Sequence, residues 1–248
     1  MFSEPGAGSD AAAVSTRGVR VEGGWRVTSQ KVWTSNAQNC NRSLATIRTD
    51  RNTPKHRGIT AMVIDLEAPG VEVRPLREIT GDALFNEVFF YDVFVPDTDV
   101  VGDVDNGLAI ARAALDNERI SIGGISHGRT PFGLIDLVRI GRDNATDIRE
   151  VGALLDHQQA LNLRQVARVV NGSSPGPESS VTTMLSAEHL RRTSETAMRR
   201  AGEAAVTGQL PEISRDYLFG RAHTIAKRTS EINRNVIDER LSCYPAST

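Results

Sequence analysis

The chain opens with the ten residues MFSEPGAGSD, Met1–Asp10, and this stretch decides how the rest of the sequence is interpreted. Pro5 has no amide donor and a fixed φ, and the glycines allow backbone conformations that other residues avoid. The stretch is therefore predicted to be a turn-rich loop. Such a loop can bring its amides and the hydroxyls of Ser3 and Ser9 close to a flat or anionic ligand. The alternative is an ordinary surface turn whose hydroxyls cap their own backbone.

Short runs of β-branched and aromatic residues follow the loop, separated by Gly, Pro, Asn and Asp. They predict two strands within Val19–Trp33 with a turn at Gly23-Gly24, and further strands at Gly58–Leu66, Val71–Pro75 and Glu87–Pro96. Residues 50–57 form a charged connection between two of these strands. This part of the chain is therefore expected to fold as an antiparallel sheet or small barrel.

From about Asn106 the sequence pattern becomes helical, because apolar residues recur at spacings of three and four. We therefore predict an α+β fold, in which an antiparallel β domain of residues 1–102 precedes an α-helical bundle of residues 103–248. Breaks within the bundle are predicted at Asn171–Glu178 and Thr207–Pro211. The arginine-rich stretch His189–Arg200 is expected to be a solvated helix face.

Composition excludes several classes of function. A net charge of −2 over 248 residues does not suggest nucleic acid or an anionic membrane surface as a partner. No apolar run is long enough to span a membrane, and the start does not resemble a secretory signal. The two cysteines, Cys40 and Cys243, need no disulfide, so a reduced cytoplasmic protein is expected. The five histidines are scattered without metal-ligand spacing, so no metal site is predicted.

Four blocks in this order resemble the acyl-CoA dehydrogenase family. They are the loop Met1–Asp10, KVWTSN at Lys31–Asn36, EVFFYDVFVP at Glu87–Pro96 and TSEINRNVIDERL at Thr229–Leu241. The resemblance covers most of the chain and implies the family's middle β domain followed by its C-terminal helical domain. Family members usually carry a further helical domain before the loop, which this chain is expected to lack.

The resemblance implies an FAD-dependent oxidation of an acyl-CoA thioester. A base removes the α-proton, and a hydride passes from the β-carbon to flavin N5. The cofactor-binding residues implied in this way are Phe2, Ser3, Gly8, Ser9, Trp33, Ser35, Arg142, Thr229 and Glu231. Arg142 would come from a neighbouring subunit to the flavin pyrophosphate. For Trp33 the alternative is a plain core tryptophan on an alternating strand.

Glu118 is the predicted catalytic base, because the resemblance places the glutamate of one family branch directly before Arg119. The other branch carries its base at the position of Lys227, and a protonated lysine cannot accept a proton. The substrate-binding residues implied by the resemblance are Ser9, Asp116, Arg119 and Lys227. The alternative for Glu118 is a solvated helical carboxylate paired with an arginine such as Arg112.

Two hypotheses follow. The first is an acyl-CoA dehydrogenase of lipid catabolism that works as a homo- or hetero-oligomer of related subunits, with electron-transferring flavoprotein as the electron acceptor. The second is a catalytically degenerate or truncated subunit with a structural role. The second is favoured by Lys227-Arg228, two long cations where the family usually has glycine close to the flavin.

Overall fold

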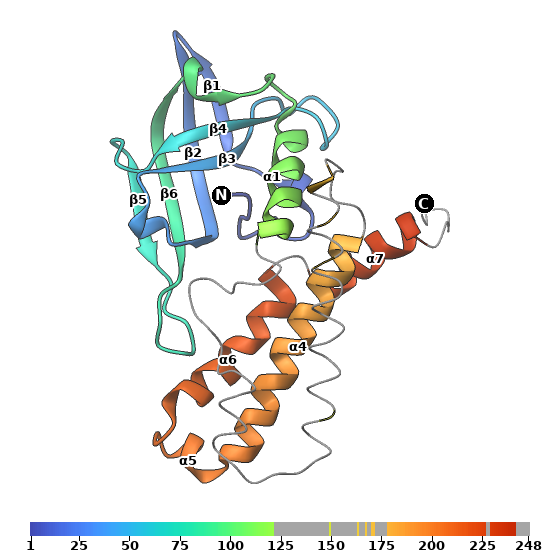
Figure 1. Ribbon diagram of the computed structural model, residues 1–248. Helices are drawn as coiled ribbons and strands as arrows, with labels where there is room; N and C mark the ends of the chain where they lie inside the picture. The colour runs from blue at the N-terminus through green and yellow to red at the C-terminus, as the bar shows by residue number, and fades with distance from the viewer. Residues whose placement is uncertain are drawn as a thin grey trace. The chain divides into compact units, whose positions relative to one another are not determined.

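The computed structural model describes residues 1–121, 178–226 and 229–241, together with the single positions 149, 163, 167, 170 and 171. The chain forms two compact units, Met1–Leu115 and Asp116–Thr248. The described part of the first unit is a β-sheet with short helical turns, and the described part of the second is helical (Figure 1).

Seven strands make up the sheet of the first unit. They are β1 (Arg17–Val21), β2 (Gly24–Ser35), β3 (Arg42–Arg48), β4 (Ile59–Asp65), β5 (Val71–Pro75), β6 (Phe85–Pro96) and β7 (Val100–Val101). The 3-10 turn η1 (Ala11–Ala13) precedes β1, while η2 (Ala37–Asn39) joins β2 to β3 and η3 (Asp97–Asp99) joins β6 to β7. The spatial order is β5-β6-β2-β1-β3-β4-β7. The predicted strands are thus confirmed, each with ends close to those expected.

Neighbouring strands are antiparallel except for β1 and β3, which meet in parallel at one pair, Arg17 with Arg48. The expected antiparallel sheet is therefore mixed at this point. The reason is the connectivity of the strands. Both β1 and β3 run opposite to β2, so β3 is parallel to β1 where it meets the free edge of β1.

One core cluster lies beneath the curled sheet. Trp25, Val27, Ala45, Ile47, Met62, Ile64, Val88, Phe90, Val93 and Val95 belong to it. These residues come from β2, β3, β4 and β6, so the two halves of the sheet share one interior. The hairpin from β1 to β2 turns at Gly23, whose φ of 74° suits glycine.

The helix α1 (Gly107–Ser121) begins in the first unit, directly after an isolated bridge between Ile59 and Asn106. A Cβ added at Gly107 would overlap the backbone of Thr60 and Ala61. The first turn of α1 is therefore seated on β4 at a distance that only glycine allows.

The described helices of the second unit are α4 (Glu178–Ala201), α5 (Glu203–Val206), α6 (Pro211–Ala226) and α7 (Ser230–Leu241). The predicted break at Thr207–Pro211 is confirmed, because α5 ends at Val206 and α6 begins at Pro211. The predicted break at Asn171–Glu178 falls largely outside the described residues. A small core cluster of Ala197, Ala205 and Ile213 joins α4, α5 and α6.

The arginine-rich stretch His189–Arg200 is exposed at Arg192 and Arg199, as expected of a solvated face, but it also has an inward face that was not predicted. This part of α4 carries a buried stripe that includes His189, Thr193, Thr196 and Ala197, each at most 7% exposed. The arginines dominate the composition of this segment, but small polar side chains take its inward positions. Among the described helices, none is long and apolar enough to cross a membrane.

The seating of α1 on β4 leads to a first prediction. Gly107→Ala should lower the free energy of unfolding of the first unit by about 1–3 kcal/mol, since its Cβ overlaps backbone that cannot move aside easily. Both tryptophans, Trp25 and Trp33, lie in this unit, so urea unfolding followed by tryptophan fluorescence reports on it.

Gly6→Ala is the matched control. A Cβ at Gly6 meets no atom within 4 Å and its φ is not positive, so this change should be neutral or stabilise by up to about 1 kcal/mol. Equal unfolding midpoints for Gly107→Ala and wild type would contradict the close seating of α1.

Candidate functional site

The middle of the opening loop folds into a tight turn, Glu4–Ala7. Glu4 and Ala7 exchange two backbone hydrogen bonds, from Glu4 N to Ala7 O at 2.8 Å and from Ala7 N to Glu4 O at 3.0 Å. Pro5 and Gly6 lie exposed at the tip, and Ala7 is buried. The turn-rich loop predicted from composition is therefore present. Pro5 is the second residue of the turn, a position that suits the fixed φ of proline.

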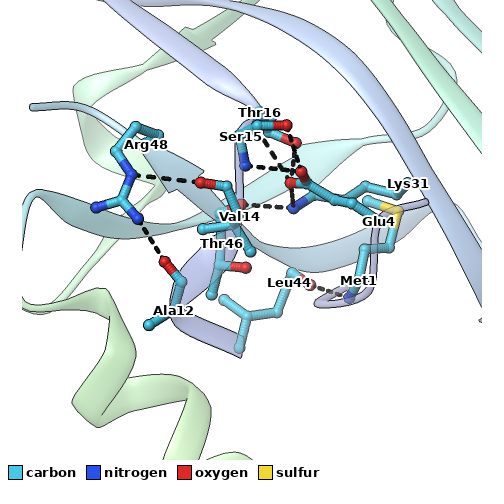
Figure 2. A network of polar contacts seen from close by, with 10 residues as sticks. All are labelled: Met1, Glu4, Ala12, Val14, Ser15, Thr16, Lys31, Leu44, Thr46 and Arg48. Carbon is cyan, nitrogen blue, oxygen red and sulfur yellow. Dashed lines mark hydrogen bonds and ion pairs between the residues drawn. The ribbon is translucent and has the colours of Figure 1, made fainter. Parts of the chain in front are cut away.

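The Glu4 carboxylate lies beneath this turn and is surrounded by donors (Figure 2). Its Oε1 accepts hydrogen bonds from Lys31 Nζ at 2.7 Å, from Thr16 N at 3.1 Å and from Thr16 Oγ1. Its Oε2 accepts from Ser15 N at 2.7 Å and from Ser15 Oγ at 2.8 Å. A buried carboxylate with five donors is stabilised in its charged form.

Lys31 supplies the counter-charge from the middle of β2, with its side chain entirely buried. Besides Glu4, its ammonium donates to the backbone carbonyl of Thr46 on β3 at 2.7 Å. Burial lowers the pKa of Lys31, and the Glu4 carboxylate opposes that shift. The pair thus joins the loop, β2 and β3 through one buried ammonium.

The pKa of Glu4 reflects the same contacts. Burial alone would raise it, but the charge and hydrogen bond of Lys31 and the hydrogen bonds from Thr16 and Ser15 lower it from 4.5 to about 2. A folded-state pKa below the unfolded value means that the carboxylate stabilises the fold above about pH 4.5. That contribution is lost as the pH falls toward 2.

A second buried cation holds the segment that follows the turn. Arg48, at the end of β3 and 8% exposed, donates to four backbone carbonyls. They are Val14 O at 3.3 Å, Ala12 O and Arg57 O at 2.6 Å each, and Lys55 O at 3.0 Å. The stretch after the loop and the connection between β3 and β4 are therefore held by the same side chain. Figure 2 shows its bonds to Val14 and Ala12.

The indole of Trp33 lies in the open, two residues beyond Lys31. It is 61% exposed, and its backbone has a φ of 59°, which is rare for a bulky residue. The pairing of β2 with β6 shifts register between Lys31 and Thr34, so Trp33 occupies a bulge. Its ring contacts Phe85 edge-on, with centroids 5.9 Å apart. The alternative of a plain core tryptophan is therefore wrong.

The two loop glycines leave empty space in front of the backbone. A Cβ at Gly6 or Gly8 would meet nothing within 4 Å, and neither residue has a positive φ. The folded chain itself does not require glycine at these positions, in contrast to Gly107. Open backbone of this kind suits close approach by a bound molecule.

The hydroxyls of the loop do not cap it. Among the described residues, the capping acceptor of η1 is Asp10, which accepts a hydrogen bond from Ala12 N at 3.2 Å. Ser3 instead contributes its backbone carbonyl, which accepts from Val32 N at 3.0 Å. The described loop therefore does not support the alternative in which Ser3 and Ser9 cap their own turn.

The structure brings some of the predicted residues together. Ser3 lies beside the strand that carries Trp33, because Val32 N donates a hydrogen bond to Ser3 O. Along the chain, Phe2 directly precedes Ser3, and Ser35 follows Trp33 by two residues. Gly8 and Ser9 follow the turn and are exposed. All six residues predicted in the β domain thus belong to one loop and one strand end.

The remaining predicted residues belong to the helical part. Asp116, Glu118 and Arg119 lie within α1, but their side chains fall outside the described part of the structure. Arg142, Lys227 and Arg228 are outside the described residues altogether. The functions predicted for Asp116, Glu118, Arg119, Arg142 and Lys227 therefore stay predictions, as does the obstruction of the flavin site expected from Lys227-Arg228.

Thr229 and Glu231 are described, and they lie at the start of α7. Thr229 Oγ1 accepts a hydrogen bond from Ile232 N at 3.3 Å, which makes it the helix cap. Hydrogen bonds that its carboxylate accepts from its own backbone amide and from Thr229 lower the pKa of the exposed Glu231. Thr229 therefore has a structural role as the cap of α7.

The sequence reasoning missed the roles of Glu4, Lys31 and Arg48. A signal for Lys31 was present, since Trp25, Val27 and Lys31 occupy inward positions at even spacing along β2. A lysine on the inward face of a strand requires a buried partner. Among the described residues, no group of His, Cys, Asp or Glu could hold a metal ion.

Two family models match this sequence. Acyl-CoA dehydrogenase, middle domain, matches residues 1–93, and acyl-CoA dehydrogenase, C-terminal domain, matches residues 105–242. Acyl-CoA dehydrogenase FadE34 of Mycobacterium tuberculosis is 41% identical over 99% of this chain and 35% of its own length. Acyl-CoA dehydrogenase IpdE1 of the same organism is 36% identical over 98% of this chain and 66% of its own length.

The fold is also found among solved structures. The Tcur3481-Tcur3483 steroid ACAD superposes with a TM-score of 0.85 at 22% identity, over 99% of this chain and 67% of that one. The chain thus spans about a third of FadE34 and about two thirds of IpdE1 and of this structure.

The buried pair leads to a second prediction. Glu4→Gln leaves the Lys31 ammonium buried without a counter-charge, so the free energy of unfolding of the first unit at neutral pH should fall by about 3–5 kcal/mol. The wild type should lose this advantage as the pH falls from about 4.5 to about 2, because its Glu4 becomes protonated there. Tryptophan-detected urea unfolding across this pH range measures both effects.

Asp97→Asn is the control, because it breaks the ion pair of Arg20 and Asp97, whose side chains are 55% and 45% exposed. Solvent screens such a pair, so its loss should matter little. If Glu4→Gln and Asp97→Asn shift the unfolding midpoint equally, the buried pair does not have the role described.

Proposed function

Because the chain belongs to the acyl-CoA dehydrogenase family, we propose that it is a flavoprotein oxidoreductase that oxidises an acyl-CoA thioester between its α- and β-carbons. The observation that carries this proposal is the exposed, strained Trp33 beside a loop whose glycines leave open space. An exposed aromatic ring held in an unfavourable backbone conformation is typical of a ligand site and has no role in the core.

The residues present fit a flavin. Phe2, Ser3, Trp33 and Ser35 would hold the ring, with an apolar indole face and two hydroxyls for its polar edge. Gly8 and Ser9 offer small, exposed positions for phosphates. Arg142 from a neighbouring subunit, Thr229 and Glu231 complete the proposed FAD-binding set.

When bound, FAD supplies the acceptor for the hydride that leaves the β-carbon of the thioester. The chain's own task is to orient the two molecules and to take the α-proton, which we assign to the carboxylate of Glu118 on α1. A carboxylate in apolar surroundings has a raised pKa, which brings it closer to that of an efficient base at neutral pH. Ser9, Asp116, Arg119 and Lys227 are proposed to contact the acyl-CoA.

The wider setting follows from the same family. We propose that residues 1–102 and 103–248 act as flavin-binding and helical domains, respectively. We also propose that the protein works in the cytoplasm, in lipid catabolism, as a homo- or hetero-oligomer of related subunits. Electron-transferring flavoprotein is the proposed acceptor of its electrons.

A structural subunit without catalysis is the second candidate. The specific observation that favours it is Lys227-Arg228, two long side chains that the sequence places directly before the capping Thr229 of α7. Purified protein decides between the candidates. A flavin spectrum, either as isolated or after addition of FAD, supports the enzyme, and a chain that takes up no FAD supports the structural subunit.

A third prediction concerns Trp33. Removal of its ring by Trp33→Ala should weaken FAD binding by about 5- to 150-fold, the equivalent of the roughly 1–3 kcal/mol that one stacked aromatic contributes. Equilibrium dialysis of FAD against the full chain measures the change. Tyr91→Ala is the control, because Tyr91 is a comparably exposed aromatic of β6, at 54%, outside the proposed site. Equal affinities for wild type and Trp33→Ala would exclude Trp33 from the flavin site.

A fourth prediction concerns Glu118. Glu118→Gln keeps the size of the side chain but removes the proton acceptor, so anaerobic bleaching of the flavin by an acyl-CoA should slow by at least about 10²–10⁴-fold. FAD binding should stay unchanged. The measurement uses a panel of acyl-CoAs of different chain length.

Glu188→Gln provides a matched control, because Glu188 is a helical glutamate that pairs with Arg191 three residues on. It represents the alternative interpretation of Glu118 as a solvated, ion-paired carboxylate, and it should leave bleaching unaffected. Bleaching of Glu118→Gln at the wild-type rate would show that the base is another residue.

A further inference from the structure

One buried ion pair lies behind both segments that the proposed flavin site uses. Glu4 directly follows Ser3 in the loop, and Lys31 precedes Trp33 by two residues in β2. Lys31 Nζ lies 2.7 Å from Glu4 Oε1, and both side chains are almost completely buried. Between these positions, Val32 N donates to Ser3 O at 3.0 Å. The loop and the strand are therefore joined at consecutive positions, of which Figure 2 shows the contact between Glu4 and Lys31.

From this geometry we propose that Glu4 and Lys31 are positioning residues, a role that rests on the proposed function. Their ion pair fixes the register of the Ser3 segment against the Trp33 segment, so that both segments face the same flavin ring. Neither residue touches the cofactor.

Directional contacts suit this role better than apolar packing would. The Glu4 carboxylate accepts five hydrogen bonds in two groups, with Lys31 and Thr16 on Oε1 and Ser15 on Oε2. Each oxygen therefore has a fixed set of partners, and a shift of the loop along β2 would break several at once. An apolar contact has no such direction and tolerates sliding.

The strained backbone of Trp33 makes a fixed register necessary. A bulky residue at a φ of 59° is unfavourable by about 1–3 kcal/mol and persists only where its surroundings determine its conformation. The anchors on either side of Trp33 are the Lys31 ammonium before it and the pairing of Thr34 with Asn86 after it. Loss of the Lys31 contact would leave the bulge at Trp33 unheld on the side that faces the opening loop.

A merely structural pair and a positioning pair differ in one measurable respect. The double variant Glu4→Gln/Lys31→Met has no unpaired buried charge, so its stability should return close to that of the wild type. If the pair is only structural, FAD affinity returns with stability. If the pair sets the register, FAD affinity stays low although the protein is stable.

The experiment uses the full chain and titrates FAD against tryptophan fluorescence, with thermal unfolding measured on the same samples. We expect the double variant to bind FAD at least about tenfold more weakly than wild type, as displacement of a contact by about 1 Å readily causes. Val95→Ala is the matched control, since it removes buried core volume on β6 and lowers stability without touching the pair. Its FAD affinity should equal that of the wild type.

Wild-type affinity in the double variant would overturn the proposal, as would a loss of affinity in Val95→Ala as large as that in the double variant. Hydrogen exchange of the cofactor-free protein provides a second readout. The Val32 amide should exchange faster in the double variant, with the Val27 amide of the same strand unchanged. Unaltered Val32 protection would also overturn the proposal. A wild-type chain that takes up no FAD would refute the proposed function, and the Val32 exchange rate would still decide the role of the pair.

Discussion

A lysine ammonium with no exposed surface needs a counter-charge, and Lys31 finds it in Glu4 of the opening loop. This pairing determines where the loop can lie. The carboxylate also accepts hydrogen bonds from the amides and hydroxyls of Ser15 and Thr16, and Lys31 donates to Thr46 on β3. The loop and the segment that follows it are therefore fixed to β2 and β3. Without the pair, the loop would keep its backbone hydrogen bonds and the apolar packing of Met1 and Ala7, and the packing has no comparable direction.

The exposed features of the site depend on this buried one. Trp33 can remain open and strained because the strand is held on both sides of the bulge. Gly6 and Gly8 can leave space in front of the loop because the turn from Glu4 to Ala7 is anchored from beneath. A rigid interior with an open face is what a site for a flat cofactor requires.

Much of the fold could be predicted from local pattern. The alternation of β2, the Gly23 turn and the VEVRP and EVFFYDVFVP runs indicate strands because these signals are local. The parallel meeting of β1 and β3 could not be predicted, since it depends on which edge a returning strand joins. The inward face of α4 at His189 was also missed, because arginines dominate the composition of that segment while smaller polar side chains fill the buried positions.

For the site, the sequence indicated the loop and Trp33 but not what holds them. The partner of Lys31 lies 27 residues away, and no spacing rule connects a buried lysine to a glutamate in a turn. The most direct measurement of the proposed site is a crystal structure of the full chain grown with FAD. Electron density for the flavin ring in contact with Trp33 and the Phe2-Ser3 segment is the predicted result. Ordered FAD elsewhere on the molecule, with this face empty, would contradict it.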